Sequence, residues 1–271
     1  MPELPEVETI KNQLSLHLPF HIQKMETSSV VASILKQRKF SPLKVRLISV
    51  QRKGKLLCFC TDHQHYILSH LGMSGAWIIS NKKITKKHTH LQFEGISNGK
   101  KMYLGYVDPR RFGNIYFADQ KLKDKKFNEL GVDLVSKEYT AEYIYQSLKK
   151  YPNRALKVCL LDQSLFAGVG NYIASEICAH ARLRPTKKCS TITKKQSGLI
   201  QMATLKVIEP TIQSGGTAFS GGYQDANGQK GEGLSHLVVF YQKICQLCKV
   251  SPVKKIILGQ RGTYYCPNCQ R

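Results

Sequence analysis

The chain has 271 residues, 42% of them hydrophobic, which suits a globular protein of two domains or of one domain with appendages. Lys and Arg number 41 against 18 Asp and Glu, so the formal net charge is +23, and such an excess indicates a polyanionic partner, with nucleic acid favoured. The sequence contains neither an apolar run of roughly 18 residues nor a signal-peptide pattern, so we expect a cytoplasmic protein that does not enter membranes.

The first predicted element is a helix near the start of the opening stretch MPELPEVETI. Pro5 suits the first helical turn, and Val7 begins a series of apolar residues at helical spacing. This interpretation leaves Pro2 and Glu3 outside the helix and without a structural explanation. A functional N-terminus would explain both residues.

Residues from about 20 to 120 contain short apolar segments that glycines and lysine-rich turns separate. This spacing predicts an antiparallel sandwich or barrel. The predicted strands are VRLISV, LLCFC, YILSH, AWIIS, HLQFEG, KMYLGYV and NIYFA.

Three short motifs interrupt these strands. RKGKLL places Lys55 at a strand entrance, HLGMSG sets Met73 between two glycine-bearing turns, and DPRRFG puts Arg110 and Phe112 on a turn. Taken singly, the apolar side chains are more often core residues and the arginine is more often solvated. In a basic protein, however, apolar wedges and an arginine can fill the gap left when a base is pushed out of a duplex stack.

From about residue 127 the periodicity becomes helical, and the segment LLDQSLFAGVGNYIASEI contains the clearest local signal. A helix is predicted to end near Asp162, a turn with Gly168 and Gly170 follows, and Asn171 stands where an N-cap would open the next helix. Amides at that helix start would form a site for a phosphate oxygen. A tightly packed helix–turn–helix joint explains the same residues equally well.

The sequence divides into three segments. We expect an N-terminal domain over residues 1–133, a helical domain over residues 134–233, and a small terminal unit over residues 234–271. The helical domain ends in a stretch rich in Gly and Ser, residues 214–233, which predicts a mobile loop.

The terminal unit contains a strong metal-binding pattern, C-x2-C-x17-C-x2-C. Each pair presents two thiolates from one tight turn, and an intervening hairpin would bring the pairs together around one tetrahedral Zn²⁺. Because protein fills all four positions, the predicted site is structural, and Arg261 lies on the hairpin between the pairs. The predicted ligands are Cys245, Cys248, Cys266 and Cys269.

Taken together, these motifs resemble the formamidopyrimidine-DNA glycosylase family. PELPEVET, RKGK, HLGMSG, DPRRFG, LLDQ…GVGN…ASE and the terminal CPNCQR occur in collinear order from residue 2 to residue 271. The resemblance implies an α+β fold in which an N-terminal helix and an antiparallel β-sandwich domain precede a helix–two-turn–helix domain. A C-terminal β-hairpin zinc finger would complete the chain.

The resemblance also implies a reaction in which the initiator methionine is removed and Pro2 becomes the nucleophile. An α-amino group titrates near pH 8, so roughly a tenth of it is neutral at pH 7, far more than for a lysine. The amine would attack C1′ of the damaged nucleotide and form a Schiff base, after which β- and δ-elimination would cut the strand. Glu3 would donate a proton to the sugar ring oxygen, while Glu6 either shares that role or orients the N-terminus.

Further residues receive DNA-contacting roles from the same resemblance. Lys55 would contact the phosphate beside the lesion as part of the catalytic set, and neighbouring phosphates would be held by Asn171, Arg261 and His88. The vacated stack would be occupied by Met73, Arg110 and Phe112. The implied substrate is double-stranded DNA with oxidised bases or abasic sites, bound by a monomer associated with the nucleoid.

Three functions remain open from the sequence. The first is a glycosylase and AP lyase for 8-oxoguanine and ring-opened purines, and the second is an endonuclease VIII-like enzyme for oxidised pyrimidines. The third is a DNA-binding protein without catalysis, which the presence of both Pro2 and Glu3 argues against. A retained Met1 would acylate the Pro2 nitrogen and abolish its nucleophilicity.

Overall fold

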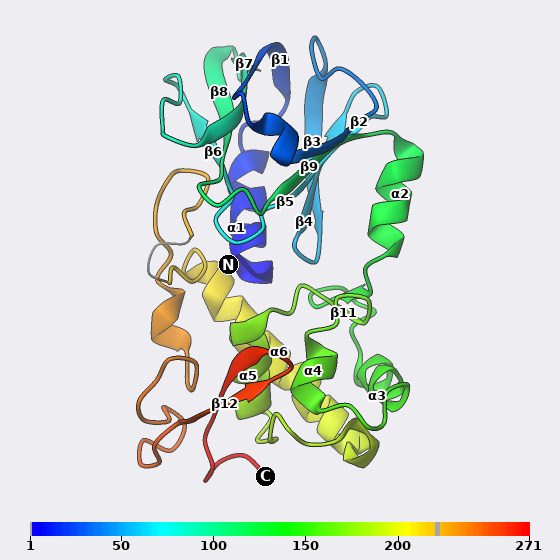
Figure 1. The fold of residues 1–271 in the computed structure, drawn as a ribbon, viewed down its shortest axis with the longest axis vertical. Coiled ribbons are helices and arrows are strands. Elements are labelled where there is room, and N and C mark those ends of the chain that lie inside the picture. The colour runs from blue at the N-terminus through cyan, green and yellow to red at the C-terminus, as the bar shows by residue number, and fades with distance from the viewer. Residues whose placement is uncertain (1, 220–222) are drawn as a thin grey trace. The chain divides into compact units, whose positions relative to one another are not determined.

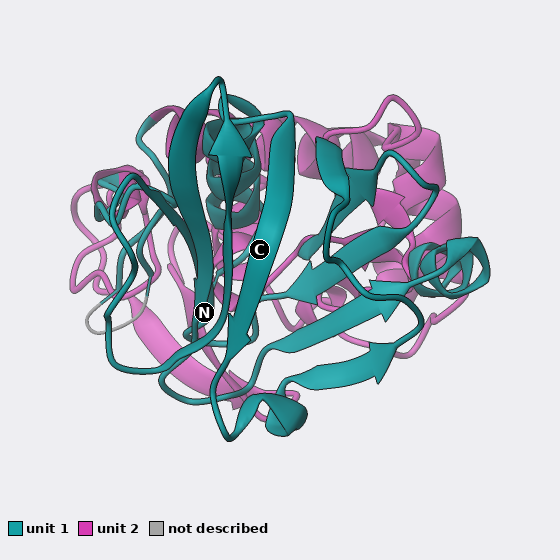
Figure 2. Cartoon of the chain, turned by 90° about the horizontal axis from the view of Figure 1, so that it is seen from above, with its two compact units in different colours: residues 1–129, 214–232 teal, residues 130–213, 233–271 magenta. Residues whose placement is uncertain are grey.

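The computed structural model describes residues 2–219 and 223–271. The chain forms two compact units, shown in different colours in Figure 2. Unit 1 comprises residues 1–129 and 214–232, and unit 2 comprises residues 130–213 and 233–271. No helix of the described residues has the length and apolar character required to cross a bilayer.

Unit 1 contains a helix, a series of strands and a second helix in chain order (Figure 1). Its elements are α1 (Leu4–Ser15), β1 (Phe20–Thr27), η1 (Val31–Ser33), β2 (Leu35–Arg38), β3 (Arg46–Lys53), β4 (Leu56–Thr61), β5 (Tyr66–His70), β6 (Ala76–Ser80), β7 (Thr89–Ser97), β8 (Lys100–Val107), β9 (Asn114–Ala118) and α2 (Gln120–Asn128).

Among the described residues, the strands of unit 1 form one nine-stranded sheet in the order β2-β9-β5-β4-β3-β1-β7-β8-β6. Every pairing is antiparallel except that of β2 with β9. Phe59 of β4 packs edge-on against Trp77 of β6 with ring centroids 5.1 Å apart, although four strands separate β4 from β6 in the order. The sheet therefore folds over itself, and its two halves enclose a common core as in a sandwich.

Helix α1 contributes its apolar stripe to this core. Val7, Ile10 and Leu14 are buried among the sheet residues of one hydrophobic cluster. Their helical spacing places them on one face, as the sequence predicts. The burial of that face fixes the direction in which the N-terminus leaves the sheet.

Unit 2 is mainly helical and ends in a two-stranded hairpin (Figure 1). Its elements are β10 (Val132–Asp133), α3 (Ala141–Lys149), α4 (Leu156–Leu160), β11 (Phe166–Ala167), α5 (Asn171–His180), η2 (Cys189–Thr191), α6 (Lys194–Gln213), η3 (Gly233–His236), β12 (Lys254–Leu258) and β13 (Arg261–Tyr265).

A buried glutamate on α5 fixes the chain that leads into this hairpin. Both Glu176 carboxylate oxygens accept backbone N–H bonds of 2.7–2.9 Å from residues 238–240. Burial raises the pKa of Glu176 to about 7 although the three donors oppose that rise. The segment before the zinc hairpin is thereby held against α5.

The predicted α+β fold is confirmed, and all seven predicted apolar strands occur as β3 to β9. The sequence did not single out β1 and β2, because most of their side chains are exposed and they lack a continuous apolar pattern. The predicted division into residues 1–133, 134–233 and 234–271 stays a prediction. The compact units group the chain differently, because residues 214–232 pack within unit 1.

Two predictions fall partly beyond the described residues. Met1, on whose removal the predicted nucleophile depends, lies outside them. The predicted loop of residues 214–233 is described except for residues 220–222.

Candidate active site and nucleic-acid interface

The N-terminus is held by two buried carboxylates. Pro2 precedes Glu3, the N-cap of α1, and the Glu3 backbone N–H donates to Glu6 Oε2 at 2.7 Å, as in a capping box. Glu3 and Glu6 are only 2% and 1% exposed. The residue next to Pro2 is therefore positioned by the side chain of Glu6.

Glu6 also anchors the loop of residues 214–232. Its second oxygen, Oε1, accepts the Thr217 N–H at 2.7 Å, and the Tyr223 hydroxyl donates to the Glu6 carbonyl at 3.3 Å. Burial, followed by the nearby Glu6 and Asp225 charges, raises the pKa of Tyr223, so its hydroxyl stays protonated as a donor. One carboxylate thus connects the start of α1 to a loop more than 200 residues away.

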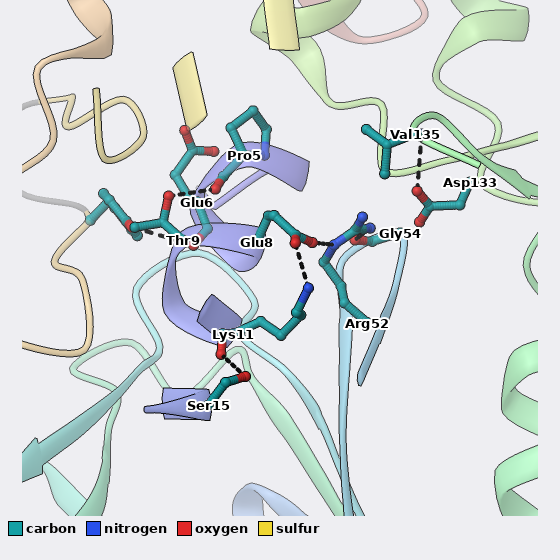
Figure 3. A network of polar contacts seen from close by, with 11 residues as sticks. Pro5, Glu6, Glu8, Thr9, Lys11, Ser15, Arg52, Gly54, Asp133 and Val135 are labelled. Atoms are coloured by element: carbon teal, nitrogen blue, oxygen red, sulfur yellow. Dashed lines mark hydrogen bonds and ion pairs between the residues drawn. The ribbon is translucent and has the colours of Figure 1, made fainter. Parts of the chain in front are cut away.

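A partly buried ion pair connects α1 to the turn that carries Lys55. Glu8 lies between Lys11 and Arg52, and the Arg52 guanidinium bonds both Glu8 Oε2 at 2.6 Å and the Gly54 carbonyl at 2.8 Å (Figure 3). Burial opposes ionisation of Glu8, but the bonds from Lys11 and Arg52 outweigh it and lower the pKa of that carboxyl. Lys55, 9% exposed, follows this turn directly.

His70 lies at the end of β5, where it pairs with Leu56, the residue after Lys55. Burial, with a smaller contribution from the Lys55 charge, lowers the pKa of His70 to about 4. The neutral imidazole accepts the Gly72 N–H through Nδ1 at 3.2 Å, so its proton resides on Nε2. His70 therefore connects the charged Lys55 to the turn that carries Met73.

The structure brings the Met73 turn and the Arg110–Phe112 turn together. Gly72 has φ +64°, and a Cβ there would lie 2.4 Å from the carbonyl carbon and oxygen of Phe112. The Arg110 guanidinium stacks over the Phe112 ring at 4.8 Å, and that ring is 53% exposed. His88 adjoins these turns, since its carbonyl accepts the Asp108 N–H.

A cavity of about 300 Å³ opens beside these turns in unit 1. The turns contribute Ser74 and Pro109 to its wall, and the loop of residues 214–232 contributes apolar, amide and lysine side chains. Its described lining is Ser74, Ala76, Ile78, Val107, Pro109, Ala218, Phe219, Tyr223, Gln224 and Lys230.

In unit 2, Asn171 contacts the zinc hairpin. Its Nδ2 donates to the Gly262 carbonyl at 3.0 Å, and its Oδ1 accepts from Lys157 Nζ at 2.8 Å. The predicted capping role of Asn171 is wrong, because Gly170 is the N-cap and Asn171 is the first helical residue. Its side chain bonds the hairpin instead, at Gly262, the residue that follows Arg261.

Lys157 is a functional candidate that the sequence did not reveal. It is fully buried, yet its ammonium group donates to the Thr263 hydroxyl at 2.9 Å and the Gly262 carbonyl at 3.3 Å, as well as to Asn171. The ammonium group therefore connects α4 to the start of α5 and to β13 of the hairpin. A lysine within the apolar run RALKVCLL was the available signal.

Arg261 follows the tight turn of the hairpin. Leu258 pairs with Arg261 across a two-residue loop, in which Gly259 and Gln260 both have positive φ, of 55° and 59°. Positive φ at both loop residues is the geometry of a type I′ turn, whose twist matches that of the two strands it joins. The Arg261 side chain is exposed at the start of β13.

The four predicted zinc ligands come together at the base of this hairpin. Their sulfur atoms all lie within 4.8 Å of one another, and the Cys245–Cys269 and Cys248–Cys266 separations are both 3.9 Å. Tetrahedral Zn²⁺ with bonds of about 2.3 Å requires sulfurs roughly 3.8 Å apart, so the residues fit the metal. The Cys248 sulfur accepts the Ser251 N–H, which favours a thiolate.

Comparison with known proteins first defines the class. Residues 1–115 match the formamidopyrimidine-DNA glycosylase N-terminal domain, and residues 130–221 match the H2TH domain of the same enzymes. Residues 251–271 match a zinc finger found in FPG and IleRS, which agrees with one structural zinc. These matches define a helix–two-turn–helix DNA glycosylase with a C-terminal zinc finger.

Full-length relatives identify the family. The chain is 35% identical to a formamidopyrimidine-DNA glycosylase of Oceanobacillus iheyensis, with 100% of this chain and 98% of the relative aligned. It is 34% identical to the enzyme of the same name from Ureaplasma parvum, over 100% of both chains. The chain belongs to the formamidopyrimidine-DNA glycosylase family, as its motifs predict.

Solved structures confirm the fold. The MutM (Fpg) protein of Thermus thermophilus matches with a TM-score of 0.85 and 29% identity, over 99% of this chain and 98% of that one. Wild-type Lactococcus lactis Fpg, solved in complex with DNA containing N7-benzyl-Fapy-dG, matches with a TM-score of 0.87 and 26% identity over 100% of both chains.

Proposed function

We propose that this protein is a bifunctional DNA glycosylase and AP lyase that removes oxidised purines from duplex DNA. The observation that carries the proposal is the N-terminal arrangement, in which Pro2 adjoins Glu3 and Glu6 holds the Glu3 backbone. Both carboxylates are almost fully buried, and full-length relatives of this chain are named formamidopyrimidine-DNA glycosylase.

The chemistry follows from a secondary amine beside a buried acid. With Met1 removed, the neutral Pro2 nitrogen attacks C1′, the glycosidic bond breaks, and the base leaves with its electron pair and takes up a proton. Proton transfer to O4′ opens the sugar ring and leaves an iminium ion between Pro2 and C1′. Loss of a C2′ proton expels the 3′ phosphate, and loss of a C4′ proton then expels the 5′ phosphate. Water finally hydrolyses the iminium bond and releases the sugar fragment from Pro2.

The contacts favour different roles for the two glutamates. Glu3 is the closer of the two to Pro2 in the chain, and we assign it the proton transfer to O4′. The oxygens of Glu6 are both engaged by backbone N–H groups, of Glu3 and of Thr217, which suits an orienting role. A carboxylate committed to two donors is less available as an acid.

The phosphate contacts are proposed in both units. In unit 2, Asn171 at the start of α5 and Arg261, whose neighbour Gly262 bonds Asn171, would hold the DNA backbone. In unit 1, Lys55 and His88 would hold phosphates near the lesion. The site of action would accordingly be the genomic duplex.

The two turns and the adjacent cavity suit base extrusion. Met73, Arg110 and Phe112 would fill the vacated stack, and the cavity beside Ser74 and Pro109 would receive the extruded base. The names of the relatives favour a purine lesion over the pyrimidine lesions of an endonuclease VIII-like enzyme.

Borohydride trapping on a duplex with 8-oxoguanine opposite cytosine tests the proposal. We expect a covalent adduct that mass spectrometry locates on the Pro2 peptide of correctly processed, zinc-loaded protein. Protein that retains Met1 should give no adduct, because its Pro2 nitrogen belongs to an amide and cannot attack C1′. Pro5→Ala, a matched change within α1, should leave trapping within about twofold of wild type.

The same assay separates the alternatives. An adduct only on a duplex with an oxidised pyrimidine would replace the proposed substrate with that of the endonuclease VIII type. Absence of an adduct on either duplex, with DNA binding retained, would identify a binding protein without catalysis.

A further inference from the structure

The two turns that carry Met73 and Phe112 share one buried acid. Asp108 is fully buried, and its Oδ1 accepts the Ser74 hydroxyl at 2.6 Å. Its Oδ2 accepts the Gly113 N–H at 2.8 Å. The carboxylate therefore bonds to the first turn with one oxygen and to the second turn with the other.

Ser74 completes this connection. Its hydroxyl donates to Asp108 and accepts the Arg110 backbone N–H at 3.1 Å. The backbone of one candidate wedge residue, Arg110, is thus fixed by the residue that follows another, Met73. The Arg111 N–H donates to the Asp108 carbonyl at 3.2 Å, which closes the second turn on itself.

A tyrosine and two glycines fit around the same acid. The buried Tyr106 hydroxyl lies 3.4 Å from Asp108 Oδ2, and burial together with the Asp108 charge raises the pKa of Tyr106. A Cβ at Gly113 would lie 1.7 Å from that hydroxyl, and one at Gly75 would lie 2.2 Å from it. Gly75, after the Met73 turn, and Gly113, after the Arg110–Phe112 turn, therefore leave the space that the Tyr106 hydroxyl occupies beside Asp108.

The side chains carried by the two turns are accessible, although the backbone of the turns is held by Asp108 and Ser74. Arg110 and Phe112 are exposed, while Met73 is half-buried. Inserting side chains into a duplex costs a few kcal/mol of base unstacking, and that cost is more easily met when the inserting groups are already ordered.

We propose that Asp108 and Ser74 are positioning residues that make the two turns a single rigid unit, so that Met73, Arg110 and Phe112 enter the duplex together. This inference rests on the proposed function, because it assigns the bond between Asp108 and Ser74 to the base-extrusion step. It predicts that the bond matters for a lesion stacked in a duplex and not for a site that is already unstacked.

Ser74→Ala tests this role with Ser80→Ala as its matched control. Ser80, at the end of β6, also accepts a backbone N–H through its hydroxyl, at 3.0 Å from Lys82, but has no bond to either turn. Single-turnover excision of 8-oxoguanine from a duplex is compared with cleavage of an abasic site in single-stranded DNA. 2-Aminopurine beside the lesion reports unstacking.

For Ser74→Ala we expect excision from the duplex to slow by at least about tenfold, because the bond to the Asp108 carboxylate and the bond from the Arg110 N–H are both lost. The unstacking signal should slow in parallel, and cleavage of the single-stranded abasic site should stay within twofold of wild type. Ser80→Ala should leave all three rates unchanged. Asp108→Asn, which keeps the shape but loses one acceptor oxygen, should resemble Ser74→Ala.

Equal losses on both substrates, or an unchanged rate on the duplex, would overturn the positioning role while leaving the proposed function intact. A wild-type protein that cleaves neither substrate would overturn the proposed function and this inference with it. Thermal unfolding of each variant identifies any loss that is due to misfolding, and Ser74→Ala, which only deletes a hydroxyl, then decides the outcome.

Discussion

At the scale of single residues, buried polar groups define the candidate site. Lys157 and Asp108 are both fully buried, and each is bonded to polar groups from separate segments of its unit. A buried charge without such partners would be strongly destabilising, so these contacts are required for the fold as well as useful to the site. His70 is a further polar residue, partly buried, and its protonation state can be tested through the pH dependence of stability.

The pH dependence of stability should reveal His70. Its pKa falls from 6.5 in the unfolded chain to about 4 in the folded one, so the unfolded state binds the proton more readily between these values. The free energy of unfolding should fall by roughly 3 kcal/mol as the pH drops from above 6.5 to 4. His70→Asn, which keeps an acceptor for the Gly72 N–H, should remove this part of the fall.

Urea unfolding at pH 7.5, 5.5 and 4 measures the effect. His21→Asn, a matched change at an exposed position of β1, should keep the wild-type fall. If His70→Asn also keeps it, the imidazole is not neutral in the folded protein.

At the scale of elements, the zinc hairpin is the clearest case of a structure that depends on a ligand. The β12–β13 ribbon is short, and Ile257 in β12 is 71% exposed whereas Tyr264 in β13 is buried, so apolar burial supports only part of it. A two-stranded ribbon is marginal in water without further support. The metal and the bonds from Asn171 and Lys157 provide that support.

Loss of the metal should therefore unfold the hairpin while leaving the sheet of unit 1 folded. Cys248→Ala should bind less than 0.2 zinc per chain and should show faster amide exchange over residues 245–269. Cys60→Ala, the same change in a cysteine of β4, should retain about one zinc and normal exchange in the hairpin. Normal exchange in the zinc-free Cys248→Ala protein would mean that the hairpin does not need the metal.

At the scale of the whole molecule, the net charge of +23 sets how the protein should respond to salt. Binding to a duplex releases counterions, so the affinity should fall linearly on logarithmic axes as salt increases. The slope counts the phosphates that are neutralised, and a single cationic contact contributes about one unit to it.

Arg261→Gln should reduce that slope by about one and weaken binding similarly for damaged and undamaged duplexes. Arg38→Gln, an exposed position on the edge strand β2, should leave the slope unchanged. Fluorescence anisotropy from 50 to 300 mM salt measures both. An unchanged slope for Arg261→Gln would remove that residue from the phosphate contacts.

Features that depend on neighbouring residues in the chain could be predicted without the structure. Alternating apolar segments gave β3 to β9, helical spacing gave the buried face of α1, and the spacing of Cys245, Cys248, Cys266 and Cys269 gave the zinc site. The strands and the helix face follow from the period of the apolar residues, and the zinc site follows from the spacing of the cysteines, so all three can be recognised in the sequence. The collinear motifs likewise indicated the family.

Contacts between residues that are distant in the chain became known only from the packing of the fold. The bond from Thr217 to Glu6, the contact of Asn171 with Gly262 and the bond of Asp108 to Ser74 join residues 211, 91 and 34 positions apart. A buried charge or a glycine against a distant backbone has no local periodicity, because its partner comes from another element. The candidate residues could be named from the sequence, whereas their positioning partners required the packing of the fold.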